Sequence, residues 1–444
     1  MPSGRPDIAE RALGEVLRHE RSQELFDRAR GLIPGGVNSP VRAMRSVGRD
    51  PIFFESGRGA ELTDVDGNVY LDYVCSWGPL ILGHAHPQVV EAVTAAAARG
   101  TSYVAPTAAE VELAGEVVER VPGAEMVRLV SSGTEATMTA VRLARAVSGR
   151  AKVLKFAGAY HGHVDGLLAE GGSGLATQGI PASPGVTEAQ AADTIVVPWN
   201  DPERFTAAVD RFGEELAVVL AEPIPANMGV VPAAPGFLET LREACDRSGA
   251  LLVLDEVISG FRVARGGAQA LLGVGGDLIV LGKVLGGGLP LAAVAGPRRL
   301  LERLAPTGDT YQAGTLSGNP LATAAGLATL RLLDEPAYDR LGQATEHLAS
   351  GLRAESAAAG VPAQVASTRG LLTLFFADAP VRDYDGARAA DAAAYARFFN
   401  GMLARGVYLP PSPFEAWFPS LAHDDGVLDR TLAAATETFA EMSR

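Results

Sequence analysis

The sequence predicts an α/β protein in which a large, doubly wound, mostly parallel sheet is joined to a smaller α+β domain. Short β-rich runs alternate with helical patterns through most of the 444 residues, as in doubly wound folds. Several runs are continuously apolar, for example LAVVLA at 216–221, which is typical of strands covered on both faces. After about residue 315 helical segments dominate, which indicates a second domain of different character.

Eight segments have the composition of strands. They are PIFFES (51–56), VYLDYV (69–74), MVRLV (126–130), AKVLKF (151–156), TIVVP (194–198), LAVVLAEP (216–223), ALLVLDEV (250–257) and LIVLG (278–282). Helices are expected between them, at 135–149 and 235–250, the latter with proline early and glycine near its end. Because ligands of such sheets bind beyond the carboxyl ends of the strands, we expect the functional site there.

The prediction divides the chain into three parts. Residues 1–60 pack with the small domain, 61–315 form the large α/β domain, and 316–444 form the small α+β domain. Helices at 318–333, 337–359 and 388–405, with strands at 366–377 and 406–412, are expected in the last part. Residues 171–186, GGSGLATQGIPASPGV, are rich in Gly, Ser and Pro. They are either a surface loop or a lid over a site.

Composition excludes several classes of partner. The formal charge of -14 and the pI of about 5.1 disfavour nucleic acid and anionic membrane. Two cysteines, Cys75 and Cys245, lie far apart and form no CxxC pattern, which suits a reducing compartment. The charged N-terminal stretch lacks the apolar core of a signal peptide, and no apolar run approaches membrane-spanning length. These features predict a cytoplasmic protein.

The first candidate site segment is SSGTEATMTAVRLAR, which follows the strand MVRLV. Ser132 and Glu135 have the spacing of a capping box, which satisfies free N–H groups at a helix start. Gly133 would let a ligand approach the backbone, and Thr134 adds a hydroxyl. Since a helix N-terminus favours an anion, a phosphate fits here as well.

The second segment is LVLDEVISGFR at 252–262, where Asp255 ends an apolar strand. A carboxylate in this position is costly unless it has a partner. The partner is either a nearby arginine, such as Arg262, or the protonated nitrogen of a bound pyridine ring. In the second case the carboxylate would keep the ring protonated and make it an electron sink.

The third segment is LGKVLGGGLP at 281–290, in which Lys283 follows an apolar strand. A lysine there either points into water or reaches a ligand beside the backbone. A primary amine forms a Schiff base only when it is unprotonated, and a desolvated site lowers its pKa toward that state. Gly286, Gly287 and Gly288 are then expected to leave room for a bound ring and for substrate.

The fourth segment is YHGHVDG at 160–166, after the strand AKVLKF. Tyr160 or His161 could stack on a flat ring. The His-Gly-His spacing could also indicate a metal site. No third ligand with suitable spacing stands out, so no metal is expected. A phosphate cradle, an Asp at a strand end and a Lys at the next strand end together match what pyridoxal 5'-phosphate requires.

These segments also carry a family resemblance. They are LIPGGVNSPVRA (32–43), SSGTEATMTAVRLAR (131–145), YHGHVDGLL (160–168), DEVISGFRV (255–263), LGKVLGGGLP (281–290), TYQAGTLSGNP (310–320) and PSPFEAWF (411–418). From about Arg21 to its end the chain resembles the class III aminotransferases, which are fold-type I enzymes dependent on pyridoxal 5'-phosphate. Within that group it is most similar to the aminomutases of glutamate 1-semialdehyde. GGVNSPVRA and QAGTLSGNP are the segments that point to the aminomutases in particular, whereas the DEV…GK pattern marks only the wider group.

The resemblance implies a role for each matching residue. Lys283 would hold the cofactor and move protons, Asp255 would bind the ring nitrogen, and Val257 would pack on one ring face opposite Tyr160 or His161. The remaining implied contacts are with the cofactor phosphate (Ser132, Gly133, Thr134), the ring hydroxyl (Glu222, Asn227), the partner subunit's cofactor (Thr315), the substrate carboxylate end (Ser39, Arg42, with Glu415 nearby) and a mobile loop (Ser173). Thr315 thereby implies a homodimer with sites at the interface.

The implied reaction moves the amine within glutamate 1-semialdehyde to give 5-aminolevulinate for tetrapyrrole synthesis, with the cofactor in its pyridoxal and pyridoxamine forms. A lid would retain the intermediate, and an upstream reductase could hand over the unstable aldehyde. An ω-aminotransferase or an amino-acid racemase on the same scaffold is the alternative. A non-catalytic cofactor-binding protein conflicts with intact Lys283 and Asp255. A cofactor-free Schiff-base aldolase leaves Asp255 and the phosphate cradle unexplained.

Overall fold

The computed structural model describes residues 17–170 and 180–443. Seven strands form the large sheet, in the order β4-β12-β11-β10-β9-β5-β8. Their bounds are β4 (Met126–Val130), β5 (Lys152–Phe156), β8 (Thr194–Val197), β9 (Leu216–Ala221), β10 (Leu251–Glu256), β11 (Leu278–Leu281) and β12 (Ala292–Gly296). β12 runs antiparallel to both of its neighbours, and the other pairs are parallel. The predicted mostly parallel sheet is therefore confirmed.

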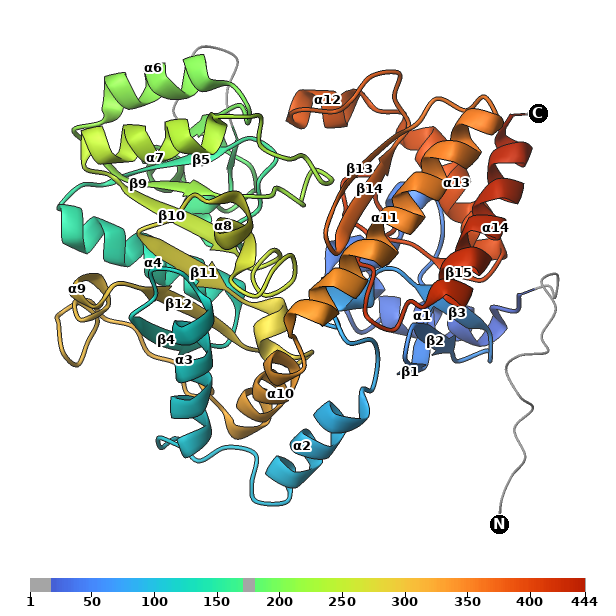
Figure 1. The fold of residues 1–444 in the computed structure, drawn as a ribbon, viewed down its shortest axis with the longest axis horizontal. Helices are drawn as coiled ribbons and strands as arrows, with labels where there is room; N and C mark the ends of the chain where they lie inside the picture. Colours follow the sequence, from blue (N-terminus) through green and yellow to red (C-terminus); the bar gives the residue numbers. More distant parts are fainter. Residues whose placement is uncertain (1–16, 171–179, 444) are drawn as a thin grey trace.

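Helices cover both faces of this sheet because successive strand residues point to opposite sides. On β10, Leu252 and Leu254 pack with α6 (Pro202–Phe212) and α7 (Phe237–Ser248). Val253, between them, packs instead in the cluster formed by the buried face of α4 (Gly133–Ser148). This division explains why the strands read as continuous apolar runs, and Figure 1 shows the sheet between its helices.

The remaining helices and short strands of this lobe lie around the sheet. They are α2 (Pro87–Ala97), α3 (Ala108–Arg120), α5 (Glu188–Ala191), α8 (Gly267–Leu272), α9 (Arg298–Leu301), α10 (Pro320–Arg331) and the hairpin strands β6 (Ala169–Glu170) and β7 (Ile180–Pro181). α10 packs against α2 and α3, so it lies with the large lobe (Figure 1).

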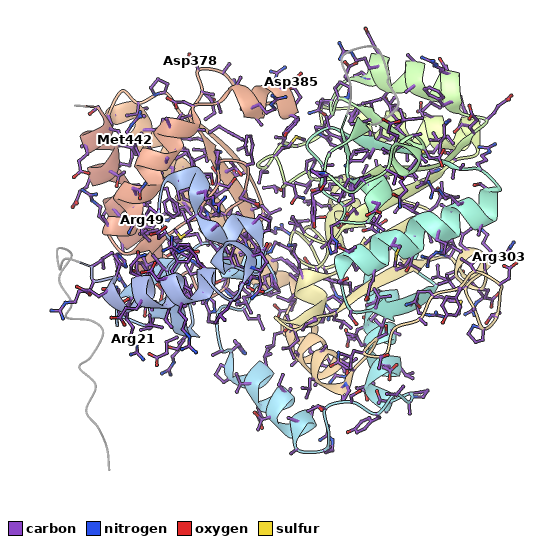
Figure 2. The ribbon with its side chains drawn as sticks, turned by 180° about the vertical axis from the view of Figure 1, so that it is seen from behind. Arg21, Arg49, Arg303, Asp378, Asp385 and Met442 are labelled. Atoms are coloured by element: carbon purple, nitrogen blue, oxygen red, sulfur yellow. The ribbon has the colours of Figure 1, made fainter. Side chains whose placement is uncertain are left out.

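A second lobe combines the two ends of the described chain. Its four-stranded sheet has the order β1-β2-β3-β15, in which the C-terminal strand pairs in parallel with β3. The strands are β1 (Phe54–Arg58), β2 (Glu61–Asp64), β3 (Val69–Asp72) and β15 (Val407–Tyr408). Figure 2 places Arg21 and Arg49 on the same lobe as Asp378 and Met442, opposite Arg303.

Five other elements of this lobe share one apolar core with that sheet, in which Tyr70 and Tyr73 lie with Phe398, Trp417 and Phe439. These elements are α11 (Glu335–Ala358), β13 (Gln364–Thr368), β14 (Leu371–Phe375), α13 (Ala392–Ala404) and α14 (Asp425–Met442). Outside this core lie α1 (Glu20–Arg30) and α12 (Tyr384–Ala389), and Ala387 of α12 packs in the cluster of α6 and α7. α11 packs against α14 and β13 (Figure 1).

The division into domains remains a proposal, and the strand pairing suggests where to adjust it. β2 and β3 lie beyond the expected boundary at residue 61 yet share a sheet with β15. α10 lies beyond the expected boundary at 315 yet packs on the large lobe. We propose that the large domain begins after Asp72 and extends through α10.

Two further observations bear on the expected environment. Within residues 17–170 and 180–443, no helix is both long enough and apolar enough to cross a bilayer. Cys75 and Cys245 are both buried and unpaired. Burial raises the pKa of each thiol, so both are poor nucleophiles.

Candidate active site

A cavity of about 370 Å³ opens at the carboxyl ends of β4, β5, β9, β10 and β11. This is the edge of the sheet where ligands of doubly wound folds bind. The predicted residues that line it come from five separate segments: Ser132, Gly133, Thr134, Tyr160, His161, Glu222, Asn227, Asp255, Val257 and Lys283. Its size falls within the usual range for small-molecule sites.

Lys283 stands at the start of a 3₁₀ turn two residues after β11. Its backbone is left-handed, with a φ of 46°, which is strained for a residue with a side chain. The side chain is half-buried and lines the cavity. Burial lowers the pKa of the amine, while the carboxylates of Glu415, Asp255 and Glu222 oppose this effect.

Asp255 is buried, and its carboxylate has two partners. Oδ1 accepts a hydrogen bond from the backbone N–H of Val257 at 3.0 Å, and Oδ2 lies 2.7 Å from Nδ1 of His161. His161 therefore binds the carboxylate edge, and Tyr160 is left as the residue available to stack on a ring. The suggestion that Arg262 is the partner of Asp255 is wrong, since its guanidinium binds backbone carbonyls instead.

One atom of this pair still has hydrogen-bonding capacity. Nε2 of His161 is buried and finds no acceptor or donor among the described residues. An unpartnered polar atom at the wall of a cavity costs free energy unless a ligand or water satisfies it. The atom therefore indicates that the cavity is built for a polar ligand.

The N-terminus of α4 forms the second wall of the cavity. Ser132 caps the helix, because its Oγ accepts from the backbone N–H of Glu135 at 3.2 Å. The carboxylate of Glu135 accepts from the N–H of Ser131 at 2.6 Å, so the expected reciprocal capping box is shifted by one residue. The N–H groups of Gly133 and Thr134 lie in the first turn, where no intrahelical acceptor exists. They remain available to an anion.

Two glycines permit close packing around this helix start. A Cβ atom on Gly133 would lie 3.2 Å from Val257, so the helix approaches the Asp255 loop at that point. A Cβ atom on Gly162 would lie 2.5 Å from Oγ1 of Thr134, and the φ of Gly162 is 83°. Glycine at both positions keeps three segments of the cavity in contact.

The expectation for the three glycines after Lys283 is only partly met. Gly288 lines the cavity. Gly287 instead allows α10 to approach, since a Cβ atom there would lie 2.5 Å from Thr329, and Gly286 packs against Leu291. Close helix packing, rather than room for a ring, explains these two glycines.

Buried Glu222 and half-buried Asn227 form a polar pair in the lining of the cavity. Nδ2 of Asn227 donates to both carboxylate oxygens of Glu222 at 3.0 Å, and the backbone N–H of Tyr160 donates to Oε1 at 3.0 Å. Burial raises the pKa of Glu222. The pair therefore fixes the loop that carries Tyr160, whose side chain is 52% exposed.

Four predicted residues lie outside the cavity lining. Ser39 precedes the 3₁₀ turn Pro40–Ala43, which contains the exposed Arg42. Thr315 is exposed on a surface segment. Glu415 lies close enough to Lys283 for their charges to interact, and burial raises its pKa to about 7. The fifth remote residue, Ser173, lies outside the described residues.

A family model described as aminotransferase class-III matches residues 44–413. This chain belongs to the class-III aminotransferase family. The predicted fold class, α/β with a large mostly parallel sheet and a smaller unit, is confirmed with it.

The relatives within this family carry two kinds of name. Glutamate-1-semialdehyde 2,1-aminomutase of Desulforudis audaxviator is 55% identical over 422 residues, which cover 95% of this chain and 98% of that protein. The structure of an omega-transaminase from Sphaerobacter thermophilus matches with a TM-score of 0.88 and 33% identity, over 95% and 97% of the two chains. A glutamate-1-semialdehyde aminomutase from Pseudomonas aeruginosa, in complex with PMP, matches with a TM-score of 0.86 and 28% identity, over 95% of each chain.

Sequence reasoning missed several cavity residues of this class-III aminotransferase. They are Pro79, Ser131, Thr137, Gly162, Ile224, Ile258, Leu289, Pro290 and Leu291. Six of them stand within the four candidate segments, which was a usable signal: Ser131, Thr137, Gly162, Ile258, Leu289 and Pro290. Pro79 is different, because it follows a turn in which Cys75, Ser76 and Trp77 are all left-handed. Only the Gly78-Pro79 dipeptide hinted at that turn.

Proposed function

We propose that this chain is a glutamate-1-semialdehyde 2,1-aminomutase, an isomerase that converts (S)-4-amino-5-oxopentanoate to 5-aminolevulinate for tetrapyrrole synthesis. The observation that carries the proposal is the 53–55% identity to relatives of that name over 95% of the chain or more. The transaminase structures that match reach 36% and 33%.

The cavity fits pyridoxal 5'-phosphate and its pyridoxamine form. The N–H groups of Gly133 and Thr134 and the hydroxyl of Ser132 suit the phosphate, and the carboxylate of Asp255 suits a protonated ring nitrogen. Tyr160 and Val257 offer surfaces for the two ring faces. When bound, the cofactor supplies an electron sink for negative charge that develops on a neighbouring substrate carbon.

Lys283 carries the proton transfers at Nζ. Its lowered pKa increases the neutral fraction of the amine, which is the form that accepts a proton. The nearby carboxylates stabilise the protonated form and so oppose the effect of burial on this pKa. Glu222 and Asn227, near the expected ring hydroxyl, would hold the ring from its other edge.

We propose that Ser39 and Arg42 bind the carboxylate end of the substrate, with Glu415 nearby, and that Ser173 is a further substrate-binding residue. The support for Glu415 is its electrostatic interaction with Lys283. Arg42 is exposed and supplies the bidentate donors that a carboxylate prefers. We propose that these groups contact the substrate when the partner subunit of a homodimer completes the cavity.

We propose a homodimer in which Thr315 reaches the phosphate of the partner's cofactor. The support is the exposure of Thr315 next to Tyr311, which is 72% exposed, and Leu316, which is 52% exposed. Large apolar side chains gathered on one surface segment favour a protein interface. Sedimentation of the holoenzyme should give twice the mass of the chain, and a monomer at micromolar concentration would contradict the proposal.

An ω-aminotransferase is the second candidate, because two solved transaminases match this chain with TM-scores of 0.87 and 0.88. The two functions differ in what they release. An aminotransferase exchanges two substrates and releases a keto product, whereas the aminomutase returns the amine to the same molecule.

One experiment separates them. Glutamate 1-semialdehyde is added to purified holoenzyme without another amine donor or acceptor, and 5-aminolevulinate is followed together with the cofactor spectrum. Stoichiometric conversion, lost in Lys283→Ala, is expected of the aminomutase. A spectral change without sustained product, rescued only by an added keto acid or amine, would establish an aminotransferase.

The cellular setting is a further part of the proposal. We propose a cytoplasmic enzyme, which suits its free, buried cysteines. We also propose that an upstream reductase hands over the unstable aldehyde by transient contact. Co-purification of the two enzymes after mild crosslinking would support this contact, and its failure at native concentrations would count against it.

A further inference from the structure

Arg262 is a fully buried charged residue that the proposed chemistry does not use. It lies seven residues after Asp255, in the loop that carries Val257 and Ile258 along the cavity. Within the part of the chain that the structure describes, its guanidinium meets backbone carbonyls and forms no ion pair with a carboxylate.

The carbonyls that Arg262 binds come from three distant segments. Nε and Nη2 donate to Gly78 O at 3.2 and 2.5 Å. Nη1 donates to Gly370 O, in the β13–β14 turn, at 2.9 Å and to Pro419 O at 3.1 Å. Since Arg262 belongs to the large lobe and two of these segments belong to the small lobe, one side chain joins both lobes beside the cavity.

The first of these segments is a strained turn. Cys75, Ser76 and Trp77 have φ values of 43°, 59° and 68°. At its start, Asp72 accepts from the N–H groups of Val74 and Cys75 at 2.8 and 3.0 Å. At its end, Arg262 holds the carbonyl of Gly78. Such strain persists only where surrounding groups over-determine it.

One end of this arrangement lines the cavity, and the other leads to Glu415, whose charge interacts with Lys283. Pro79, next to Gly78, lines the cavity. Pro419 lies four residues after Glu415, in a segment anchored to β14 by paired hydrogen bonds between Leu372 and Trp417. We name residues 75–79 and 415–419 the substrate-side wall.

Stability alone does not require a charge at this position. A well-packed apolar side chain is often as stable as a buried ion. Arginine adds a planar fork of five donors, which can serve three carbonyls at fixed angles. Burial lowers its pKa to about 10, so it remains charged at neutral pH, and it stacks 5.2 Å from the ring centre of Phe418.

We propose that Arg262 is a positioning residue that fixes the substrate-side wall relative to Asp255 and Lys283. This inference rests on the proposed function, because that function assigns substrate contact to the Glu415 side of the cavity. Arg262 touches neither substrate nor cofactor. It acts through the backbone of Gly78 and Pro419.

The test is Arg262→Lys in the full-length holoenzyme. Lysine keeps the charge but cannot bridge three carbonyls. The expected result is a rise in KM for glutamate 1-semialdehyde of about tenfold, with cofactor affinity and cofactor absorbance within about threefold of wild type. Arg120→Lys is the matched control, because Arg120 is also buried and binds a backbone carbonyl, that of Leu333, but neither residue adjoins the cavity lining, as Gly78 does through Pro79.

A second variant leaves Arg262 in place. Gly370 has a φ of 73°, and a Cβ atom there would lie 2.9 Å from Cδ2 of Leu341, 3.3 Å from Cγ and 3.4 Å from Nη1 of Arg262, so Gly370→Ala strains this turn and crowds both Leu341 and the guanidinium. We expect the same selective rise in KM, by a few-fold. This variant decides the question if Arg262→Lys does not fold.

Two results would overturn the proposal. One is an unchanged KM in both variants. The other is a loss of cofactor affinity as large as the rise in KM, which would make Arg262 a support of the fold alone. If wild-type enzyme transaminates instead of isomerising, the proposed function fails, and the Arg262 variants are then compared on the amine that the wild type uses.

Discussion

The two halves of the candidate site are built in different ways. The cofactor half, Ser132–Thr134, Tyr160, His161, Asp255–Val257 and Lys283, stands on the ends of parallel strands and lines one cavity. The substrate half, Ser39, Arg42 and Glu415, lies on short turns and loops, outside that lining. Site residues at one edge of a sheet are brought together within one chain, whereas site residues on loops from several segments need further contacts to come together.

The largest effect should come from the cofactor half. Asp255→Asn removes the negative charge that would hold a protonated ring nitrogen, and the new amide competes with His161. We expect kcat/KM to fall by about 10²–10³-fold, since a charge aimed at the reacting group is lost. The measurement is steady-state turnover with cofactor in excess.

Asp277→Asn is the control for Asp255→Asn. Asp277 stands at the opposite end of the same sheet, where it accepts from Leu252 N–H at 2.8 Å and from Arg242 at 2.9 Å. Its replacement should lower the melting temperature and leave the turnover of folded enzyme unchanged. Equal losses of turnover in Asp255→Asn and Asp277→Asn would mean that the carboxylates at the two ends of the sheet do not differ in function.

The next effect should come from the substrate half. Arg42→Ala should raise KM for glutamate 1-semialdehyde by about tenfold, the cost of one charge-assisted hydrogen bond, and leave cofactor affinity unchanged. Arg45→Ala removes another exposed arginine three residues away and should have wild-type KM. If Arg42→Ala also weakens cofactor binding, the two halves are not separable.

Glu415 should give a smaller effect that depends on pH. Burial raises its pKa from 4.5 to about 7, so its contribution to stability is present below about 4.5 and is lost as pH rises through 7. Glu415→Gln avoids the cost of the buried charge. The shift corresponds to about 3 kcal/mol at most, which solvent screening at this half-buried site reduces to roughly 1–2 kcal/mol.

The measurement for Glu415→Gln is the melting temperature of apoenzyme between about pH 5 and pH 8. The melting temperature of the variant should rise relative to that of wild type as pH rises. Glu346→Gln is the control and should change the melting temperature in the opposite direction. Hydrogen bonds from Ser350 and the charge of Arg353 lower the pKa of Glu346, whereas the pKa of Glu415 is raised. A gain for Glu415→Gln that is independent of pH would contradict the assignment.

The smallest effect is expected at the helix start. Gly133→Ala places a methyl group 3.2 Å from Val257, so one of the two segments must shift by a few tenths of an ångström. Cofactor affinity should fall by a factor of about two to five. Gly115→Ala, in α3 with open space around its Cβ position, should instead stabilise the chain by about 0.4–1 kcal/mol. Isothermal titration and thermal melting provide the two readouts.

The cofactor half was predictable because strand ends are visible in the sequence. Apolar runs marked β4, β5, β9, β10 and β11, and the topology of a doubly wound sheet places their carboxyl ends at one edge. The family resemblance supplied Thr315 and Ser39, which no periodicity marks. The expected strands at 51–56 and 69–74 exist as β1 and β3 with shifted bounds, but in the small sheet.

The errors concern partners, which a sequence does not encode locally. Arg262 stands seven residues from Asp255, yet the carboxylate binds His161, 94 residues away. Gly286 and Gly287 read as room for a ligand, but their neighbours are Leu291 and α10. In each case a long-range contact decided the role of a residue type that local spacing left open.

The pairing of β3 with β15 also has a consequence for synthesis of the chain. The last strand of the large sheet ends at residue 296, whereas the small sheet is complete only after residues 407–408 have been synthesised. At about 5–20 residues per second, a ribosome takes roughly 5–20 s to cover that interval. During this time the edge of β3 is unpaired, and such edges invite aggregation. Until this two-residue strand is made, the nascent chain therefore carries an unpaired strand edge at β3 that chaperones would have to protect.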